Sequence, residues 1–513
     1  MSEAQGAKMA ESTAAGLGPT RHTTGFRLAS YKPNWLLISF PTVIGLGTVL
    51  PARLTAVLLI GIGVMSFRRR RPRQGEGTSR IAPTWGSAIL PALSLAIILR
   101  PNDPATVLGT ATYVIGLIVF LHILRLSDSK SSALVSLIDG VGLFLVASVV
   151  LTLAGVATKS DRTAGLENSI TGGKRVIFAL SPHLAATPDV AGVFIAAIFP
   201  LLIAYRQFRF LRLTALTFAI YVLIASQVRM AIFVAVTVTI VAFAFPRATR
   251  AISAWLIALL LSLPFFFRNA QSDVMGQLGR AVAVNFPGMI RDGDAGGVLS
   301  TRQDIWQKAQ AYQSTWVDPA SQIFGYGAFG HVKSGAALSY TTELNFVGFA
   351  ERRFITPHNS TLVVLYDAGW LGVFFFIGTI TFAARLFARG HSPVDLAALS
   401  ALIGLCMVGT TETGLTAESN QAVWWLLMGL VVVAFSREEQ SASLREPTSR
   451  RRLASPISPV HPIFGHNKPA RSLDPKPRDL SGAYLRTSAD TPGESRLGVR
   501  YCGEAHTYTD GPI

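Results

Sequence analysis

The chain has 513 residues, of which 50% are hydrophobic and only 15% are charged, and its mean hydropathy is +0.42. This composition, with its long apolar stretches, excludes an ordinary soluble domain and indicates an all-α polytopic membrane protein. The formal net charge of +17 does not indicate a nucleic-acid partner, because the Lys and Arg residues cluster between apolar runs and near the C-terminus. Cys406 and Cys502 are too few for a disulfide framework or a cysteine-based metal site.

Residues 1–33 form a polar segment too long to be an ordinary signal peptide, and we expect this segment to stay in the cytoplasm. The polytopic membrane domain follows over 34–436, with about twelve predicted spans. The predicted spans are 34–50, 52–67, 84–100, 105–124, 132–155, 189–204, 213–228, 230–245, 251–267, 361–384, 395–412 and 420–436.

Short basic loops between the spans predict the orientation of the bundle. They all fall on one side, which is therefore expected to be cytoplasmic, and they cover 67–73, 125–130, 205–212, 246–250 and 385–390. The opposite side receives the loop 156–188 and one large loop, 268–360, between the ninth and tenth spans. A loop of this length is typical of a functional segment. Residues 437–513 are rich in Pro, Ser and Arg and predict a disordered basic cytoplasmic tail.

Within the large loop, "STRQDIWQKAQAYQSTW" (300–316) predicts an amphipathic helix that can lie on the membrane surface. Ser300 and Gln303 have the spacing of a capping box. Arg302 lies in the first turn, where free backbone N–H groups and the helix dipole suit phosphate oxygens. The alternative is an arginine that extends to lipid headgroups.

The large loop ends at "PHNS" (357–360), directly before an apolar run. Pro357 disfavours helix in the preceding residue, and Asn359 or Ser360 can cap the helix that follows. His358 is thus predicted at the outer end of a membrane helix, where the dipole disfavours added positive charge and a neutral imidazole can act as a general base. The alternative is an interfacial histidine that caps the helix.

Arg229 in "SQVRM" interrupts two apolar spans at an outer turn. A charge at this depth is costly and indicates an anionic partner, or else an interfacial anchor. The segment "GYGAFGH" (325–331) lacks the Lys-Ser/Thr of a phosphate-binding loop, and Gly325 and Gly327 are interpreted as turn glycines. The acidic pairs Asp292/Asp294 and Glu412/Glu418 lack metal-ligand spacing with His, so no metal is predicted.

In order and sidedness, these features resemble the superfamily of O-antigen ligases and O-antigen polymerases. The resemblance rests on "SQVR", "STRQDIW", "PASQIFGYGAFG" and "PHNSTLVVLYDAGWLG", and covers about 190–435, although the family more often has Ser-Arg-Gly where this chain has "SQVR". The family's functional arginines and histidine would fall on Arg229, Arg302 and His358. Asn359, Gly325 and Gly327 would support them.

The resemblance implies an enzyme of the bacterial cytoplasmic (inner) membrane that uses neither metal nor nucleotide. It would transfer a glycan from an undecaprenyl-pyrophosphate carrier to an acceptor hydroxyl, of a lipid or of another glycan, on the extracytoplasmic face. Ligase and polymerase use the same donor and the same chemistry, so both stay open. The alternatives are a secondary transporter or lipid-linked oligosaccharide flippase, and a membrane scaffold or receptor. Against transport, the sequence shows no paired broken helices.

Overall fold

The computed structural model describes residues 32–68, 80–100, 107–156, 175–180, 183–205, 208–266, 300–340 and 355–439. These residues are mostly helical, with one small sheet. The elements in chain order are α1 (Trp35–Leu46), α2 (Ala52–Arg68), β1 (Arg80–Ala82), α3 (Trp85–Ile98), α4 (Val107–Arg125), α5 (Lys130–Leu153), α6 (Ala186–Ala204), α7 (Arg209–Ser226), α8 (Arg229–Ala244), α9 (Pro246–Phe266), α11 (Ser300–Thr315), α12 (Pro319–Phe324), α13 (Gly330–Lys333), α14 (Ala336–Tyr340), α16 (Ser360–Arg389), α17 (Pro393–Gly409), η3 (Ala417–Ser419), α18 (Ala422–Phe435) and β2 (Arg437–Glu439).

Six of the described helices are long and apolar enough to cross a membrane, namely α4, α5, α6, α7, α9 and α16. Five shorter apolar helices of 10–17 residues accompany them: α1, α3, α8, α17 and α18. Every predicted span overlaps one of these helices or α2. The predictions of a helical fold and of several apolar helices long enough to cross a membrane are confirmed in the described residues.

Small residues let several of these helices approach closely, as is usual for helix packing in membranes. A Cβ atom added to Gly192 in α6 would lie 2.5 Å from the carbonyl oxygen of Ala231 in α8. One added to Gly140 in α5 would lie 2.9 Å from the carbonyl oxygen of Ile38 in α1. Glycine at these two positions therefore sets the spacing of both helix pairs.

One end of the bundle gathers several of the segments predicted to be cytoplasmic. Strand β1 pairs antiparallel with β2, with Ile81 opposite Glu438. Nearby, the Thr84 hydroxyl donates to the Phe435 carbonyl at 2.6 Å, and the Lys130 amide donates to the Glu438 carboxylate at 2.9 Å. These contacts join the start of α3, the start of α5 and the end of α18.

One basic residue at this end was misinterpreted as a loop residue that marks orientation. Arg212 lies within α7, is 2% exposed, and its Nε and Nη2 donate to the two carboxylate oxygens of Asp139 in α5 at 2.8 and 2.9 Å. A bidentate pair of this kind compensates two buried charges. The helix begins earlier than predicted, so this arginine ties α7 to α5.

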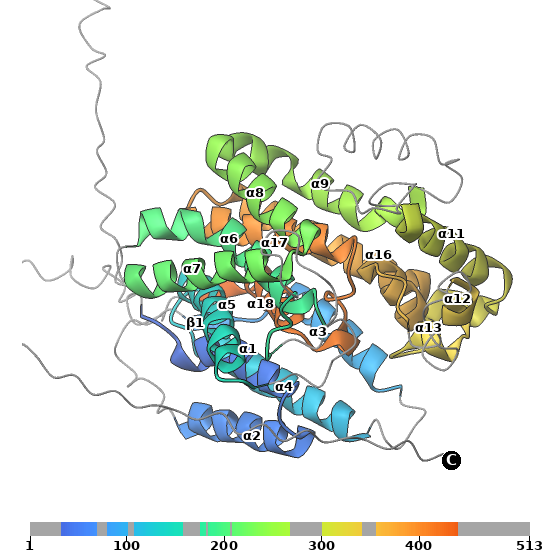
Figure 1. The fold of residues 1–513 in the computed structure, drawn as a ribbon, viewed down its shortest axis with the longest axis horizontal. Coiled ribbons are helices and arrows are strands. Elements are labelled where there is room, and N and C mark those ends of the chain that lie inside the picture. The colour runs from blue at the N-terminus through green and yellow to red at the C-terminus, as the bar shows by residue number, and fades with distance from the viewer. Residues whose placement is uncertain are drawn as a thin grey trace, which may run out of the picture. The chain divides into compact units, whose positions relative to one another are not determined.

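The predicted helix at 300–316 is present as α11, and it packs on the bundle more than the sequence suggests. Ile305, Trp306 and Ala309 are buried, and the Gln310 side chain donates to the Pro264 carbonyl of α9 at 2.7 Å. Trp316, just past the helix, is 75% exposed. Figure 1 shows α11, α12 and α13 gathered around one end of α16. The segment "GYGAFGH", in which turn glycines were predicted, also contains the start of the short helix α13 at Gly330.

Helix α16 is broken at Gly369, whose φ of +65° and ψ of −169° are not helical. The break leaves the carbonyls of Tyr366 and Asp367 without helical partners, and they accept hydrogen bonds from the amides of Tyr326 and Gly327, both at 2.8 Å. The glycine segment before α13 (residues 325–327) therefore supplies the hydrogen bonds that the broken helix lacks. This single break was not predicted from the sequence, which shows no paired broken helices.

Some predictions concern residues outside those described. These are the N-terminal segment up to residue 31, the parts 267–299 and 341–354 of the large loop, the acids Asp292 and Asp294, and the tail from residue 440 onward. The side chains of Ser300 and Gln303 also lie outside the described part, so the capping box stays a prediction.

Candidate functional site

The Glu412 carboxylate lies between Arg302 and His358, two of the predicted site residues. Its Oε1 lies 3.0 Å from Arg302 Nη2, and its Oε2 lies 3.8 Å from His358 Nδ1. The side chain of Glu412 is 12% exposed, whereas those of Arg302 and His358 are 29% and 39% exposed. The acid is thus enclosed, and the two basic groups face outward from it.

The start of α16 positions Glu412. As predicted, Asn359 caps this helix: its Oδ1 accepts hydrogen bonds from the amides of Thr361 and Leu362 at 2.9 and 3.1 Å. Its Nδ2 donates to the Thr410 carbonyl at 3.0 Å, and the hydroxyl of the next residue, Ser360, donates to the Glu412 carbonyl at 2.7 Å. The motif therefore fixes the loop after α17 as well as the start of α16.

His358 lies directly before the helix cap, with a φ of +47°. This left-handed conformation is uncommon for residues other than glycine, and Asn, Asp and His tolerate it best. Since Asn359 makes the capping hydrogen bonds, the alternative interpretation of His358 as the cap is wrong. The imidazole points its Nδ1 toward Glu412 instead.

The charges around Glu412 keep it ionised. Burial raises the pKa of its carboxyl, but the neighbouring His358 and the charge of Arg302 lower it, and the net pKa is about 2. A carboxylate that stays ionised across the physiological range can orient both neighbours. It also leaves the remaining N–H groups of the Arg302 guanidinium for another anion.

Two further residues near this cluster were missed in the sequence. His183, just before α6, accepts a hydrogen bond from the Gln421 side chain at 3.0 Å, and burial lowers its pKa. Asp189, in the first turn of α6, is 2% exposed and interacts electrostatically with Glu412 and Arg302. The candidate site thus draws on the ends of α6, α11, α16 and α17.

Arg229, the third predicted cation, is the first residue of α8 and is half-buried. Arg229 lies at the same end of the α6–α8 pair as Asp189, because Gly192 of α6 packs against Ala231 of α8. Within the part of the chain that the structure describes, Arg229 has no hydrogen-bond or ion-pair partner. The structure therefore joins Arg302 and His358 through Glu412, and in the described residues no hydrogen bond or ion pair joins Arg229 to either.

Gly325 and Gly327 support α16 rather than His358 itself. Both have positive φ, +71° and +79°. A Cβ atom added to Gly325 would lie 2.3 Å from the Ala368 amide nitrogen, and one added to Gly327 would lie 2.5 Å from Arg100 Cβ. Their turn geometry, predicted from the sequence, allows the close approach of this segment to the break in α16.

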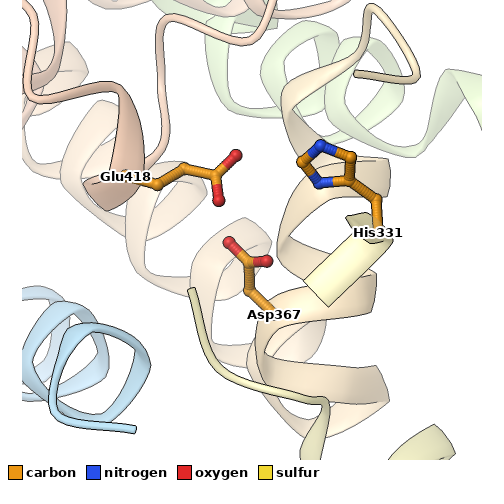
Figure 2. Close-up of side chains that lie close together, drawn as sticks. All are labelled: His331, Asp367 and Glu418. Atoms are coloured by element: carbon orange, nitrogen blue, oxygen red, sulfur yellow. The ribbon is translucent and has the colours of Figure 1, made fainter. Parts of the chain in front are cut away.

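A second cluster of functional groups lies beside that break. His331 of α13, Asp367 of α16 and Glu418 of η3 converge, and one ligand atom from each lies within 4.8 Å of the others (Figure 2). Burial lowers the pKa of His331 to about 4, and burial also raises the pKa of Glu418 above its usual range. Glu418 was not predicted as a metal ligand, because its spacing from histidine along the sequence does not match a metal-binding motif.

Sequence spacing also explains why Glu412 was missed. Glu412 lies 110 residues from Arg302, and only the packing of the loop after α17 on the start of α16 brings the two together. The available signal was one acid, Glu412, at the predicted outer end of an apolar span.

Among known proteins, no family model matches the chain and no curated protein shows significant sequence similarity to it.

Proposed function

We propose that this protein is a membrane glycan transferase of the O-antigen ligase or polymerase type. It moves a glycan from an undecaprenyl-pyrophosphate carrier to an acceptor hydroxyl. The observation that carries the proposal is the Arg302–Glu412–His358 cluster, which combines an anion-binding group and a candidate base at the end of a membrane helix.

The donor pyrophosphate binds at Arg302, whose guanidinium has N–H groups beyond the one held by Glu412. Arg229, without a partner among the described residues, supplies a second cation. As the anomeric C–O bond to pyrophosphate breaks, negative charge develops on the leaving group. Charge-assisted hydrogen bonds from arginine stabilise this charge.

The acceptor hydroxyl attacks the anomeric carbon from the face opposite the leaving group. The new bond joins the acceptor oxygen to that carbon, and the hydroxyl proton passes to His358. Glu412, 3.8 Å from the imidazole, stabilises the imidazolium that forms, and the proton then leaves to water. The attack inverts the anomeric configuration.

The proposed membrane topology has twelve spans in the bacterial inner membrane, both termini in the cytoplasm, and the 268–360 loop outside. The basic loop 385–390, at the opposite end of α16 from the cluster, supports this orientation. A reporter fused after Gly327 should read outside, and fusions after Arg71 or Ser443 should read inside. An inside result at Gly327 removes the extracytoplasmic assignment.

The direct test uses the purified protein in detergent with an undecaprenyl-pyrophosphate glycan, and measures the release of polyprenyl pyrophosphate. Release that requires an acceptor supports the proposal. Failure to release it with any of several lipid and glycan acceptors rejects the proposal.

A lipid-linked oligosaccharide flippase is the second candidate, and the break in α16 at Gly369 favours it. Transporters commonly form their sites at discontinuous helices. In the described residues, however, the carbonyls freed at the break are occupied by the Tyr326 and Gly327 amides. Movement of an unchanged donor across a proteoliposome membrane would favour the flippase over the transferase.

A further inference from the structure

We propose that His331, Asp367 and Glu418 form a binding site for one divalent metal ion of the Zn²⁺ or Mn²⁺ class. This inference does not depend on the proposed glycan transfer. The three side chains come from three separate elements, α13, α16 and η3, and point toward one another (Figure 2). One potential ligand atom from each lies within 4.8 Å of the other two.

Two atoms in the cluster are buried without a partner. His331 and Asp367 are each 1% exposed, and within the described residues His331 Nδ1 and Asp367 Oδ2 accept or donate no hydrogen bond. Leaving a buried polar atom unpaired costs about 1–3 kcal/mol. Such atoms in a native structure need an explanation, and a metal ion shared by the three side chains would supply one.

Backbone amides hold the other oxygens of the two carboxylates. The Gly330 amide donates to Asp367 Oδ1 at 2.8 Å, and the Phe329 amide donates to Glu418 Oε2 at 2.6 Å. In metal sites, hydrogen bonds of this kind orient the side chains that bind the metal ion. The Gly330 contact leaves Asp367 Oδ2 without a hydrogen-bond partner among the described residues.

The donor set selects the class of ion. One imidazole nitrogen and two carboxylate oxygens suit Zn²⁺, Mn²⁺ or Fe²⁺, whereas Mg²⁺ and Ca²⁺ prefer oxygen ligands alone. Two carboxylates balance the charge of one divalent ion. Lys333 lies beside the cluster. Its ammonium group donates to the carbonyls of Arg100 and Tyr326 at 3.0 and 3.3 Å, and these two backbone oxygens hold the ammonium in place.

A bound ion would link the glycine segment to the broken helix and to the loop that carries Glu412. Glu418 lies on the same connection between α17 and α18 as Glu412, and His331 follows the amides that complete α16. The ion would therefore fasten the three segments that surround the break.

The test is metal binding by the purified full chain in detergent after treatment with a chelator. Titration with Mn²⁺, followed by electron paramagnetic resonance, and with Zn²⁺, in competition with a chromophoric chelator, measures stoichiometry and affinity. We expect one ion per chain, and binding weakened about 10–100-fold or more by His331→Gln, Asp367→Asn or Glu418→Gln. Asp318→Asn is the control, because it removes an exposed carboxylate that caps α12 and lies outside both clusters, and it should bind the ion as the wild type does.

Absence of stoichiometric binding in the wild type overturns the proposal, as does equal binding by folded Glu418→Gln. If the three variants fail to fold, X-ray absorption on the Zn²⁺-loaded wild type decides. One coordinated imidazole with oxygen neighbours supports the site. A shell without imidazole, or with several imidazoles, overturns it.

Discussion

His358 Nδ1 lies 3.8 Å from a carboxylate oxygen of Glu412, although the two residues lie on different connections of the chain. The other oxygen of the same carboxylate holds Arg302 at 3.0 Å. One acid thus positions a candidate base and a candidate phosphate-binding group together. The cap residues Asn359 and Ser360 hold its backbone in place.

Replacing this acid should impair the reaction while the donor still binds. Glu412→Gln keeps the size of the side chain but loses the charge that orients His358 and stabilises its cationic form. In serine proteases, loss of the carboxylate that orients the histidine lowers kcat about 10⁴-fold, and we expect at least about a 10-fold loss here. Asp318→Asn, which replaces the exposed cap residue of α12, is the control. Equal kcat for Glu412→Gln and wild type would show that the acid has no part in turnover.

Arg302→Lys should lose most of the transfer activity while the protein is expressed normally. A lysine ammonium can replace the contact with Glu412, but it cannot also present a planar pair of N–H groups to pyrophosphate. We expect kcat/KM to fall by about 10-fold or more, which corresponds to about 1.4 kcal/mol. The same substitution at Arg229 tests its proposed role as the second cation. If lysine serves as well as arginine at both positions, the two residues are interfacial anchors.

Gly325→Ala should destabilise the fold through the break in α16. The new Cβ atom would lie 2.3 Å from the Ala368 amide nitrogen, and the φ of +71° is strained for alanine. We expect a loss of about 1–3 kcal/mol, seen as a lower midpoint of thermal unfolding in detergent. Gly378→Ala is the control. Gly378 lies in α16, and a Cβ atom added there has no atom within 4 Å, so the midpoint should stay unchanged or rise. Equal midpoints for the two variants would contradict the close packing described.

Much of the fold follows from periodicity and hydropathy, because each membrane helix must satisfy its own backbone within lipid. Local signals also predicted the cap at Asn359 and the turn glycines. The break at Gly369 was missed, because a single glycine in an apolar run is tolerated in a helix. Glu412 and Asp139 were missed for a different reason: each acquires its partner only through tertiary packing.

Acid should destabilise the protein through Glu412. Burial raises the pKa of this carboxyl, the neighbouring His358 and the Arg302 charge lower it, and the net pKa is about 2. An unfolded glutamate titrates near about 4.3, so the folded protein gains stability above that pH and loses it as the pH falls through 2. Glu412→Gln should be less stable at pH 7 by on the order of 3 kcal/mol.

Thermal midpoints of both proteins at pH 7, 5 and 3 test this prediction. The gap between wild type and Glu412→Gln should be full at pH 7, nearly full at pH 5 and clearly smaller at pH 3. A gap that stays constant from pH 7 to pH 3 would mean that Glu412 is not the group responsible.

Single-turnover transfer by purified His358→Asn, compared with wild type, tests the central claim most directly. Asparagine tolerates the left-handed backbone at this position, where φ is +47°, so the variant should fold, insert and bind the lipid-linked donor. It cannot accept a proton near neutral pH, and removing a general base lowers the rate about 10²–10⁴-fold. We predict normal donor binding with polyprenyl pyrophosphate released at least about 10²-fold more slowly. Release at the wild-type rate would contradict the assignment of His358 as the base.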